Sequence, residues 1–211
     1  MQVYKGLDIA TNKITHAEKQ GVRHYLVDIH IRKRHYLFLS EVQCLHRNFL
    51  KTQCVPIIVG GSNSYIEKLV EDPVFMFKYK YDSCFIWIDV EQLVLNRRVD
   101  RRVDKTVNAG LVNEVRQIFI PDIFKGRKII DRDDESKKMI PQTSISSIKN
   151  NTHILICYQL DKIQRLINEK LWLVHQIIAS DVFEEDRKEV VDEALRNTVL
   201  QPCLAIVKRF L

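Results

Sequence analysis

The stretch Val55-Pro56-Ile57-Ile58-Val59-Gly60-Gly61-Ser62-Asn63 carries the strongest indication of the fold. Its first five residues are apolar throughout, as in a parallel strand that is covered on both faces. Two glycines end the run, and Tyr65, Ile66 and Leu69 then follow with helical spacing. A strand, a glycine turn and a helix make the βα unit of an α/β fold.

The alternation of strands and helices continues along the chain. Residues 84–90 and 171–178 are two further apolar runs, and both predict strands. Between the two runs, apolar residues repeat every four positions up to Phe119, a spacing that drifts around a single straight helix. Gly110 interrupts this pattern. We therefore expect two helices, over 91–109 and 111–119.

The region 121–151 shows no periodicity. It contains the mixed charge run 131–138, and we interpret it as an irregular charged insertion in a single domain that spans 1–211. A regular apolar spacing resumes afterwards, so we expect a helix to begin at Thr152. The last helical segment should be broken by Pro202, because proline lacks the N–H that a helix interior needs.

Composition is that of an ordinary globular chain with a basic excess. The 211 residues include 33 Lys and Arg against 27 Asp and Glu, a net charge of +6. This charge suits an anionic partner, although many proteins carry as much without one. All apolar runs are far shorter than the roughly 18 residues of a membrane span. We expect a soluble intracellular monomer, in the cytoplasm or a plastid, with no membrane partner.

Cysteine and histidine spacing argues against a metal site. The five cysteines form no CxxC pair, and the seven histidines form no HExxH motif. An odd number of dispersed cysteines favours buried free thiols in a reducing compartment.

The glycine turn is the first candidate for chemistry. Gly60 and Gly61 allow a ligand to approach the backbone, and Ser62 adds a hydroxyl where a helix N-terminus attracts phosphate oxygens. A plain tight turn, with Ser62 or Asn63 as a helix cap, explains the same residues.

Three further groups are weaker candidates. Arg98, Arg102 and Lys105 share one helix face, which indicates either a phosphate clamp or a face neutralised by Asp100, Asp104 and Glu114. Gln159, Lys162 and Arg165 lie off the apolar stripe of the helix beginning at Thr152, as ligand-binding or solvated residues would. Thr11, Asn12 and Lys13 form a polar segment that could meet a nucleotide.

Six sequence blocks, taken together, resemble the plant adenylate isopentenyltransferases. They are MQVYKGLDIATNKIT (1–15), PIIVGGSNSYIE (56–67), YDSCFIWIDV (81–90), RRVDKTVNAGLVNEVRQIF (101–119), CYQLDKIQRL (157–166) and the C-terminal IVKRFL. The blocks follow the family's order, and the family is similar to tRNA dimethylallyltransferases. The resemblance implies an α/β fold with a P-loop NTPase-like parallel sheet and flanking helices, lacking the family's first two strands, plus a partly helical insertion.

The resemblance also implies a reaction. Dimethylallyl diphosphate would donate its five-carbon group to the exocyclic amine of adenine in ATP, ADP or AMP, the first step of cytokinin synthesis, with Mg²⁺ as cofactor. Ser62, the catalytic residue, would face the diphosphate or the amine together with Gly60 and Gly61. The remaining substrate-binding residues would be Arg102, Gln159 and Lys162 on phosphates, and Thr11 and Lys13 near the adenine.

The family's phosphate loop, of the type GATGTGKS, and its general-base aspartate would both precede the block that here begins at Met1. No G-x-x-x-x-G-K-[ST] motif occurs in the sequence. We therefore expect this chain alone to be poorly folded or inactive. Two alternatives stay open: a tRNA dimethylallyltransferase, which the missing zinc-finger spacing disfavours, and a non-catalytic remnant of the family that at most binds nucleotide.

Overall fold

The fold is taken from a computed structural model, which describes residues 5–27, parts of 41–51, 55–74, 77–119, 142–184 and 188–211. Two compact units divide the chain. The first comprises Met1–Ile58 with Arg102–Ile148, and the second Val59–Arg101 with Lys149–Leu211. The expectation of one domain over 1–211 stays a prediction.

The second unit contains a parallel sheet. Strand β1 (Phe85–Asp89) pairs with β2 (Val174–Ile178) in the register Phe85↔Val174 to Asp89↔Ile178. Both predicted strands are thereby confirmed, and so is the α/β class with a parallel sheet. The second strand is shorter than predicted, because the chain turns through Leu171 at a φ of 54° before it enters β2.

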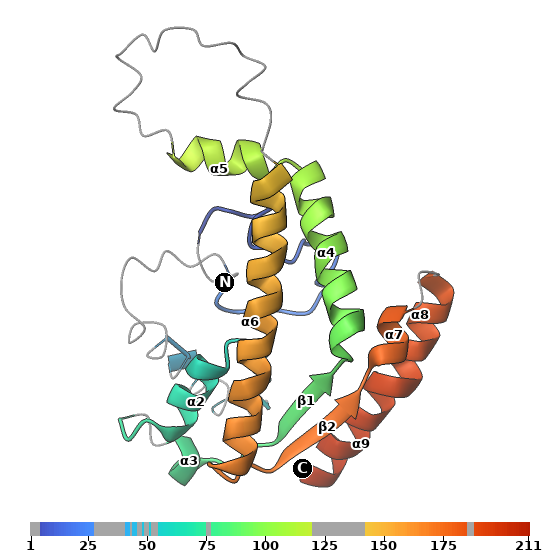
Figure 1. Ribbon diagram of the computed structural model, residues 1–211. Helices are drawn as coiled ribbons and strands as arrows, with labels where there is room; N and C mark the ends of the chain where they lie inside the picture. Colours follow the sequence, from blue (N-terminus) through green and yellow to red (C-terminus); the bar gives the residue numbers. More distant parts are fainter. Residues whose placement is uncertain are drawn as a thin grey trace, which may run out of the picture. The chain divides into compact units, whose positions relative to one another are not determined.

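Helices flank this sheet (Figure 1). On one face, α2 (Asn63–Glu71) and α6 (Gln142–Asn168) contribute Val70 and Leu166 to a buried cluster with Trp172, and Phe85 and Val174 pack against the cluster. The π-helical segment η2 (Leu195–Leu200) and helix α9 (Gln201–Phe210) contact β2. Side chains alternate along a strand, so the buried Ile177 lies on the opposite face from Val174.

The remaining helices are short, apart from α4 (Gln92–Asn108). Among the described residues, the short helices include α3 (Phe77–Lys80), α5 (Leu111–Phe119), α7 (Ser180–Glu184) and α8 (Lys188–Ala194). The predicted break between two helices is confirmed at Gly110, whose φ of 104° is a conformation that favours glycine. None of the helices in the described part of the chain combines the length and the apolar character that a bilayer crossing needs.

The predicted strand at 55–59 is wrong. Residues 55–60 form no regular secondary structure, and Ile57 and Val59 are 84% and 90% exposed. A strand needs a hydrogen-bonding neighbour, and the sheet of the described residues contains β1 and β2 as its strands. The glycine turn at Gly60-Gly61 and the helix after it are nevertheless present.

Two helix boundaries also differ from the prediction. Helix α6 begins at Gln142, so residues 142–151 of the predicted irregular insertion are helical, while 121–141 lie outside the described residues. Partly buried positions at Ile145, Lys149 and Thr152 extend the helix face toward its N-terminus. Pro202 does not break the last helix. It lies in the first turn of α9, and η2 immediately before it supplies a wider turn in which the missing N–H is tolerated.

Candidate functional site

The glycine turn precedes α2 and opens onto free space. The N–H of Asn63 donates to the carbonyl of Gly61 at 3.0 Å, and Ser62 is the N-cap residue of α2 without a side-chain capping bond. Neither Gly60 nor Gly61 has a positive φ, and a Cβ at either would meet no atom of the described residues within 4 Å. Backbone strain and crowding therefore do not explain why glycine stands at these two positions.

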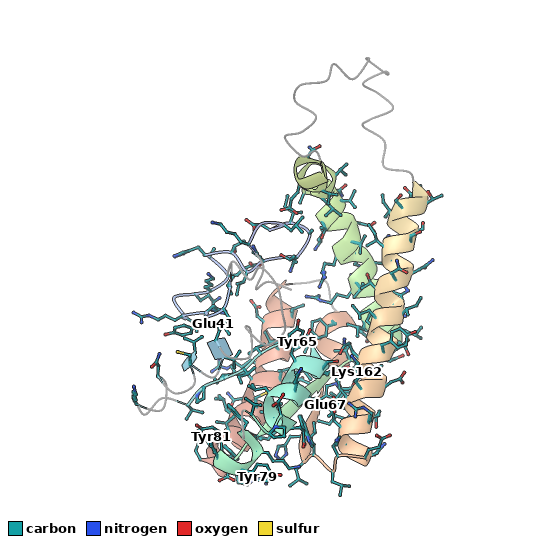
Figure 2. All side chains as sticks on the ribbon, turned by 90° about the vertical axis from the view of Figure 1, so that its left-hand side faces the viewer. Glu41, Tyr65, Glu67, Tyr79, Tyr81 and Lys162 are labelled. Atoms are coloured by element: carbon teal, nitrogen blue, oxygen red, sulfur yellow. The ribbon has the colours of Figure 1, made fainter. Side chains whose placement is uncertain are left out.

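Polar contacts join the first turns of α2 to α6, and we call this set the α2–α6 seam. The side-chain amide of Asn63 donates to Oε1 of Gln159 at 3.0 Å, and the ammonium of Lys162 donates to Oγ of Ser64 at 2.5 Å. One turn further along, Arg165 forms an ion pair with Glu67. Figure 2 labels Glu67 on α2 and Lys162 on α6, the two helices that the seam connects. The seam thus holds Gln159 and Lys162 beside the residues that follow the glycine turn.

At the C-terminal end of α2, the buried indole of Trp172 forms a hydrogen bond with the carboxylate of Glu71. Nε1 of Trp172 donates to Glu71 at 2.9 Å, and the ring of Trp172 stacks on Phe85 with centroids 4.3 Å apart. The indole N–H lowers the pKa of Glu71, and the nearby Lys78 ammonium contributes in the same direction. This end of α2 is anchored to the sheet, so the position of the glycine turn at its other end depends on the core.

The outer side of α6 forms a shallow hollow next to the seam. It is lined by Leu155, Tyr158, Gln159, Asp161, Lys162 and Arg165. Exposed apolar surface from Leu155 and Tyr158 thus adjoins the amide of Gln159 and two cationic side chains. An anion with an apolar tail matches this combination of groups.

Thr11 and Lys13 lie in the first unit, in a loop closed by its own hydrogen bonds. The hydroxyl of Thr11 donates to the carbonyl of Leu7 at 2.7 Å. The ammonium of Lys13, whose side chain is 7% exposed, donates to the carbonyl of Gly6 and pairs with Asp8 at 2.7 Å. The predicted contacts of Thr11 and Lys13 with substrate stay predictions, because both polar groups here bind within the loop.

The three basic residues predicted to share a face of α4, Arg98, Arg102 and Lys105, are exposed. The guanidinium of Arg98 lies 4.5 Å from the centroid of the Phe183 ring. Arg102 is exposed in the first unit, and its carbonyl accepts a bond from Thr106. A joint site of Arg102 with the seam stays a prediction, because Arg102 belongs to the first unit and the seam to the second.

The acidic residues proposed to neutralise this face have partners of their own. Asp100 accepts a bond from His153 at 2.9 Å. Glu114 accepts bonds from the backbone N–H groups of Ile9 and Ala10 at 2.8 and 2.7 Å. Sequence reasoning missed these pairs, and also Asn63 and Ser64 as partners of Gln159 and Lys162. Matching the polar positions of two amphipathic helices would have suggested the seam, but nothing in the sequence pairs Glu114 with the loop.

Metal and thiol chemistry find little support among the described residues. No group of three His, Cys, Asp or Glu side chains in the described part of the chain could hold a metal ion. The described cysteines are free thiols, and Cys44 and Cys157 are exposed, contrary to the expectation that the cysteines are mostly buried. Burial raises the pKa of the Cys203 thiol, with Cys84 contributing, which makes Cys203 a poor nucleophile.

Comparison with known proteins identifies relatives over the whole chain. The model of a family described as IPP transferase matches residues 2–78 and 75–153. Adenylate isopentenyltransferase 5 of Arabidopsis thaliana, named as chloroplastic, is 40% identical over 100% of this chain and 70% of its own length. Adenylate isopentenyltransferase 7 of the same plant, named as mitochondrial, is 36% identical over 100% of this chain and 70% of its own length.

Solved structures share the fold. A eukaryotic dimethylallyltransferase that acts on tRNA aligns with a TM-score of 0.70 at 17% identity, over 100% of this chain and 71% of that chain. The tRNA isopentenylpyrophosphate transferase of Staphylococcus epidermidis aligns with a TM-score of 0.63 at 20% identity, over 92% of this chain and 86% of that one. With the parallel sheet, the flanking helices and the relatives above, these matches lead to one conclusion: the chain belongs to the IPP transferase family of prenyltransferases, and it is 30–40% identical to four adenylate isopentenyltransferases of Arabidopsis thaliana.

Proposed function

We propose that this chain serves the transfer of the dimethylallyl group from dimethylallyl diphosphate to the exocyclic amine of an adenine nucleotide, ATP, ADP or AMP. Four relatives at 30–40% identity are named adenylate isopentenyltransferases, which supports a free nucleotide as acceptor. The observation that carries the proposal is the α2–α6 seam, which holds Lys162 and Gln159 next to the turn of Gly60, Gly61 and Ser62.

The reaction needs hydrogen-bond donors at the leaving group, which is the diphosphate. The bond between the allylic carbon and the diphosphate oxygen breaks, a bond to the adenine nitrogen forms, and that nitrogen loses a proton. Negative charge grows on the departing diphosphate, so preorganised N–H, O–H and ammonium donors lower the barrier. Lys162 and Gln159 would bind the diphosphate, and Ser62 would donate to it or face the reacting amine. In the first unit, Arg102 would bind phosphate, and Thr11 and Lys13 the adenine side.

The hollow on α6 offers a place for the donor's tail. Leu155 and Tyr158 are exposed beside Lys162 and Gln159, so an isoprenoid chain could lie on apolar surface while its diphosphate meets the seam. Neither Gly60 nor Gly61 is explained by the packing of the protein, which is consistent with a ligand that approaches the backbone there.

In this proposal, Mg²⁺ would bind together with the diphosphate of the substrate. The described residues offer no carboxylate cluster for a metal, and Glu67, the carboxylate on the seam, is paired with Arg165. Magnesium commonly binds through one or two carboxylates plus substrate phosphates and water. We therefore keep Mg²⁺ as a proposed partner of the substrate's phosphates, and no step is assigned to the ion.

The experiment is a turnover assay with a choice of acceptor. Purified protein is incubated with dimethylallyl diphosphate, Mg²⁺ and either ATP, ADP, AMP or tRNA, and prenylated products are measured by mass spectrometry. We expect product on the free nucleotides, with Ser62→Ala slower and the exposed control Ser146→Ala unchanged. Product at a measurable rate would also overturn the expectation, drawn from the sequence, that this chain alone is poorly folded or inactive.

Each other outcome favours a different function. Product on tRNA alone would make the chain a tRNA dimethylallyltransferase. Retained binding of dimethylallyl diphosphate without product on any acceptor would favour the non-catalytic candidate. Equal rates for the wild type and Ser62→Ala would overturn the role of Ser62. We also propose a monomer in a plastid or the cytoplasm, and the mass of the purified protein in solution tests the first point.

A further inference from the structure

The loop Leu7–Lys13 is a compact turn with two backbone donors at its start. Thr11, Asn12 and Lys13 donate their N–H groups to the carbonyls of Leu7, Ile9 and Asp8 at 2.9, 3.1 and 3.0 Å. As at the beginning of a helix, the N–H groups earlier in such a turn have no carbonyl within the turn to bond. In this loop, two of those earlier donors belong to Ile9 and Ala10.

One carboxylate satisfies both donors. Oε1 of Glu114 accepts from Ile9 at 2.8 Å and Oε2 accepts from Ala10 at 2.7 Å, across more than 100 residues of sequence. Hydrogen bonds to a carboxylate are stronger than those between neutral groups, and two neighbouring N–H groups form a favourable site for an anion. The bonds are partly buried, which limits competition from water.

A steric fit accompanies this contact. Helix α5 begins directly after Gly110, and Glu114 lies in its first turn. An ideal Cβ built on Gly110 would lie 3.8 Å from Cδ1 of Ile9. The loop also holds Leu7 and Asn12 at φ values of 56° and 48°, which non-glycine residues rarely adopt. Such conformations persist when the surrounding structure imposes them. Glu114 contributes to this constraint through its two hydrogen bonds to the loop backbone.

We propose that Glu114 is a positioning residue, which fixes the loop of Thr11 and Lys13 so that it can receive the acceptor nucleotide. The inference rests on the proposed function, since it assigns the acceptor to this loop and the diphosphate donor to the α2–α6 seam. Glu114 touches neither substrate in this account. It acts through the backbone of Ile9 and Ala10.

The test separates acceptor from donor. The dissociation constants of AMP and of dimethylallyl diphosphate are measured for the wild type, Glu114→Ala, Glu114→Gln and the exposed neighbour Asn113→Ala, and amide hydrogen exchange is followed in residues 7–13. For Glu114→Ala we expect exchange at Ile9 and Ala10 to accelerate at least about tenfold, the effect of losing a hydrogen bond to a charged group. AMP should bind about tenfold more weakly, because its binding would then have to order the loop. The donor constant should stay within about twofold of wild type, as should both constants in Asn113→Ala.

Glu114→Gln keeps one acceptor oxygen and should fall between the wild type and Glu114→Ala, and it provides the comparison if the alanine variant does not fold. Faster exchange with an unchanged AMP constant would overturn the inference and leave Glu114 a structural residue. Equal weakening of both ligands would overturn it as well. A wild type that binds neither ligand would count against the proposed function instead, whatever the exchange pattern.

Discussion

Two largely apolar segments of five residues, 85–89 and 55–59, have similar sequence character and different structures. The first forms β1, pairs in parallel with β2 and stacks Phe85 on the buried Trp172. The second forms no regular structure and leaves Ile57 and Val59 among the most exposed apolar residues of the described chain. Asp89 ends the first run, and Gly60 and Gly61 follow the second. An apolar run therefore becomes a strand only when a partner strand and a covering helix are available to it.

The largest expected effect lies on the paired side of this comparison. Trp172 is 9% exposed and packs with Val70 and Leu166, so Trp172→Ala should lower the free energy of unfolding by about 3–5 kcal/mol, the usual loss for a large buried aromatic residue. Urea unfolding monitored by circular dichroism measures it. The exposed Tyr79→Ala is the matched aromatic control, with an expected change below about 0.5 kcal/mol. Equal losses in the two variants would show that the core is not centred on Trp172.

A smaller effect should follow pH at the same core. Because the folded pKa of Glu71 is lowered below its ordinary value of 4.5, its contribution to stability is complete above pH 4.5 and is lost as pH falls through the folded pKa. Trp172→Phe keeps an aromatic ring but removes the N–H, so it should cost on the order of 1 kcal/mol at pH 7.

The pH series sharpens this prediction. Unfolding free energies between pH 7 and pH 3 should fall less steeply in Trp172→Phe than in the wild type, because Glu71 then titrates closer to its ordinary value. Parallel curves for the two proteins would mean that the indole does not hold the carboxylate in solution.

The smallest change in stability is expected for a substitution in residues 55–59, which form no strand. Val59 is 90% exposed, so Val59→Ala should change the free energy of unfolding by less than about 0.5 kcal/mol. The same urea titration measures it, with the buried Val182→Ala as the valine control that should lose clearly more. A loss for Val59→Ala as large as that for Val182→Ala would break the comparison, since it would mean that the 55–59 run is buried in solution.

Local pattern was sufficient wherever neighbouring residues decide the structure. The strand at Phe85–Asp89, helix α2 and the break at Gly110 follow from an apolar run, a helical spacing and a glycine φ, all within a few residues. Remote partners decided the rest. No local signal says that Val55–Val59 lacks a strand partner among the described residues, or that Glu114 binds the loop of Ile9 and Ala10.

The candidate site divides in the same way. The glycine turn, Gln159 and Lys162 were identified from residue type and from resemblance to a family. Their partners Asn63 and Ser64 were not, because a pairing between two helices depends on how those helices pack and not on either sequence alone. The common site of this group with Arg102, Thr11 and Lys13 is still a prediction.

Binding of dimethylallyl diphosphate tests the central claim that the α2–α6 seam holds a pyrophosphate. Calorimetric titration of the wild type, Lys162→Ala and the exposed α2 control Lys68→Ala measures the three dissociation constants. We predict that Lys162→Ala binds at least about tenfold more weakly, as expected for the loss of a charged hydrogen bond, and that Lys68→Ala stays within about twofold of wild type. Identical affinities in all three proteins would contradict the account.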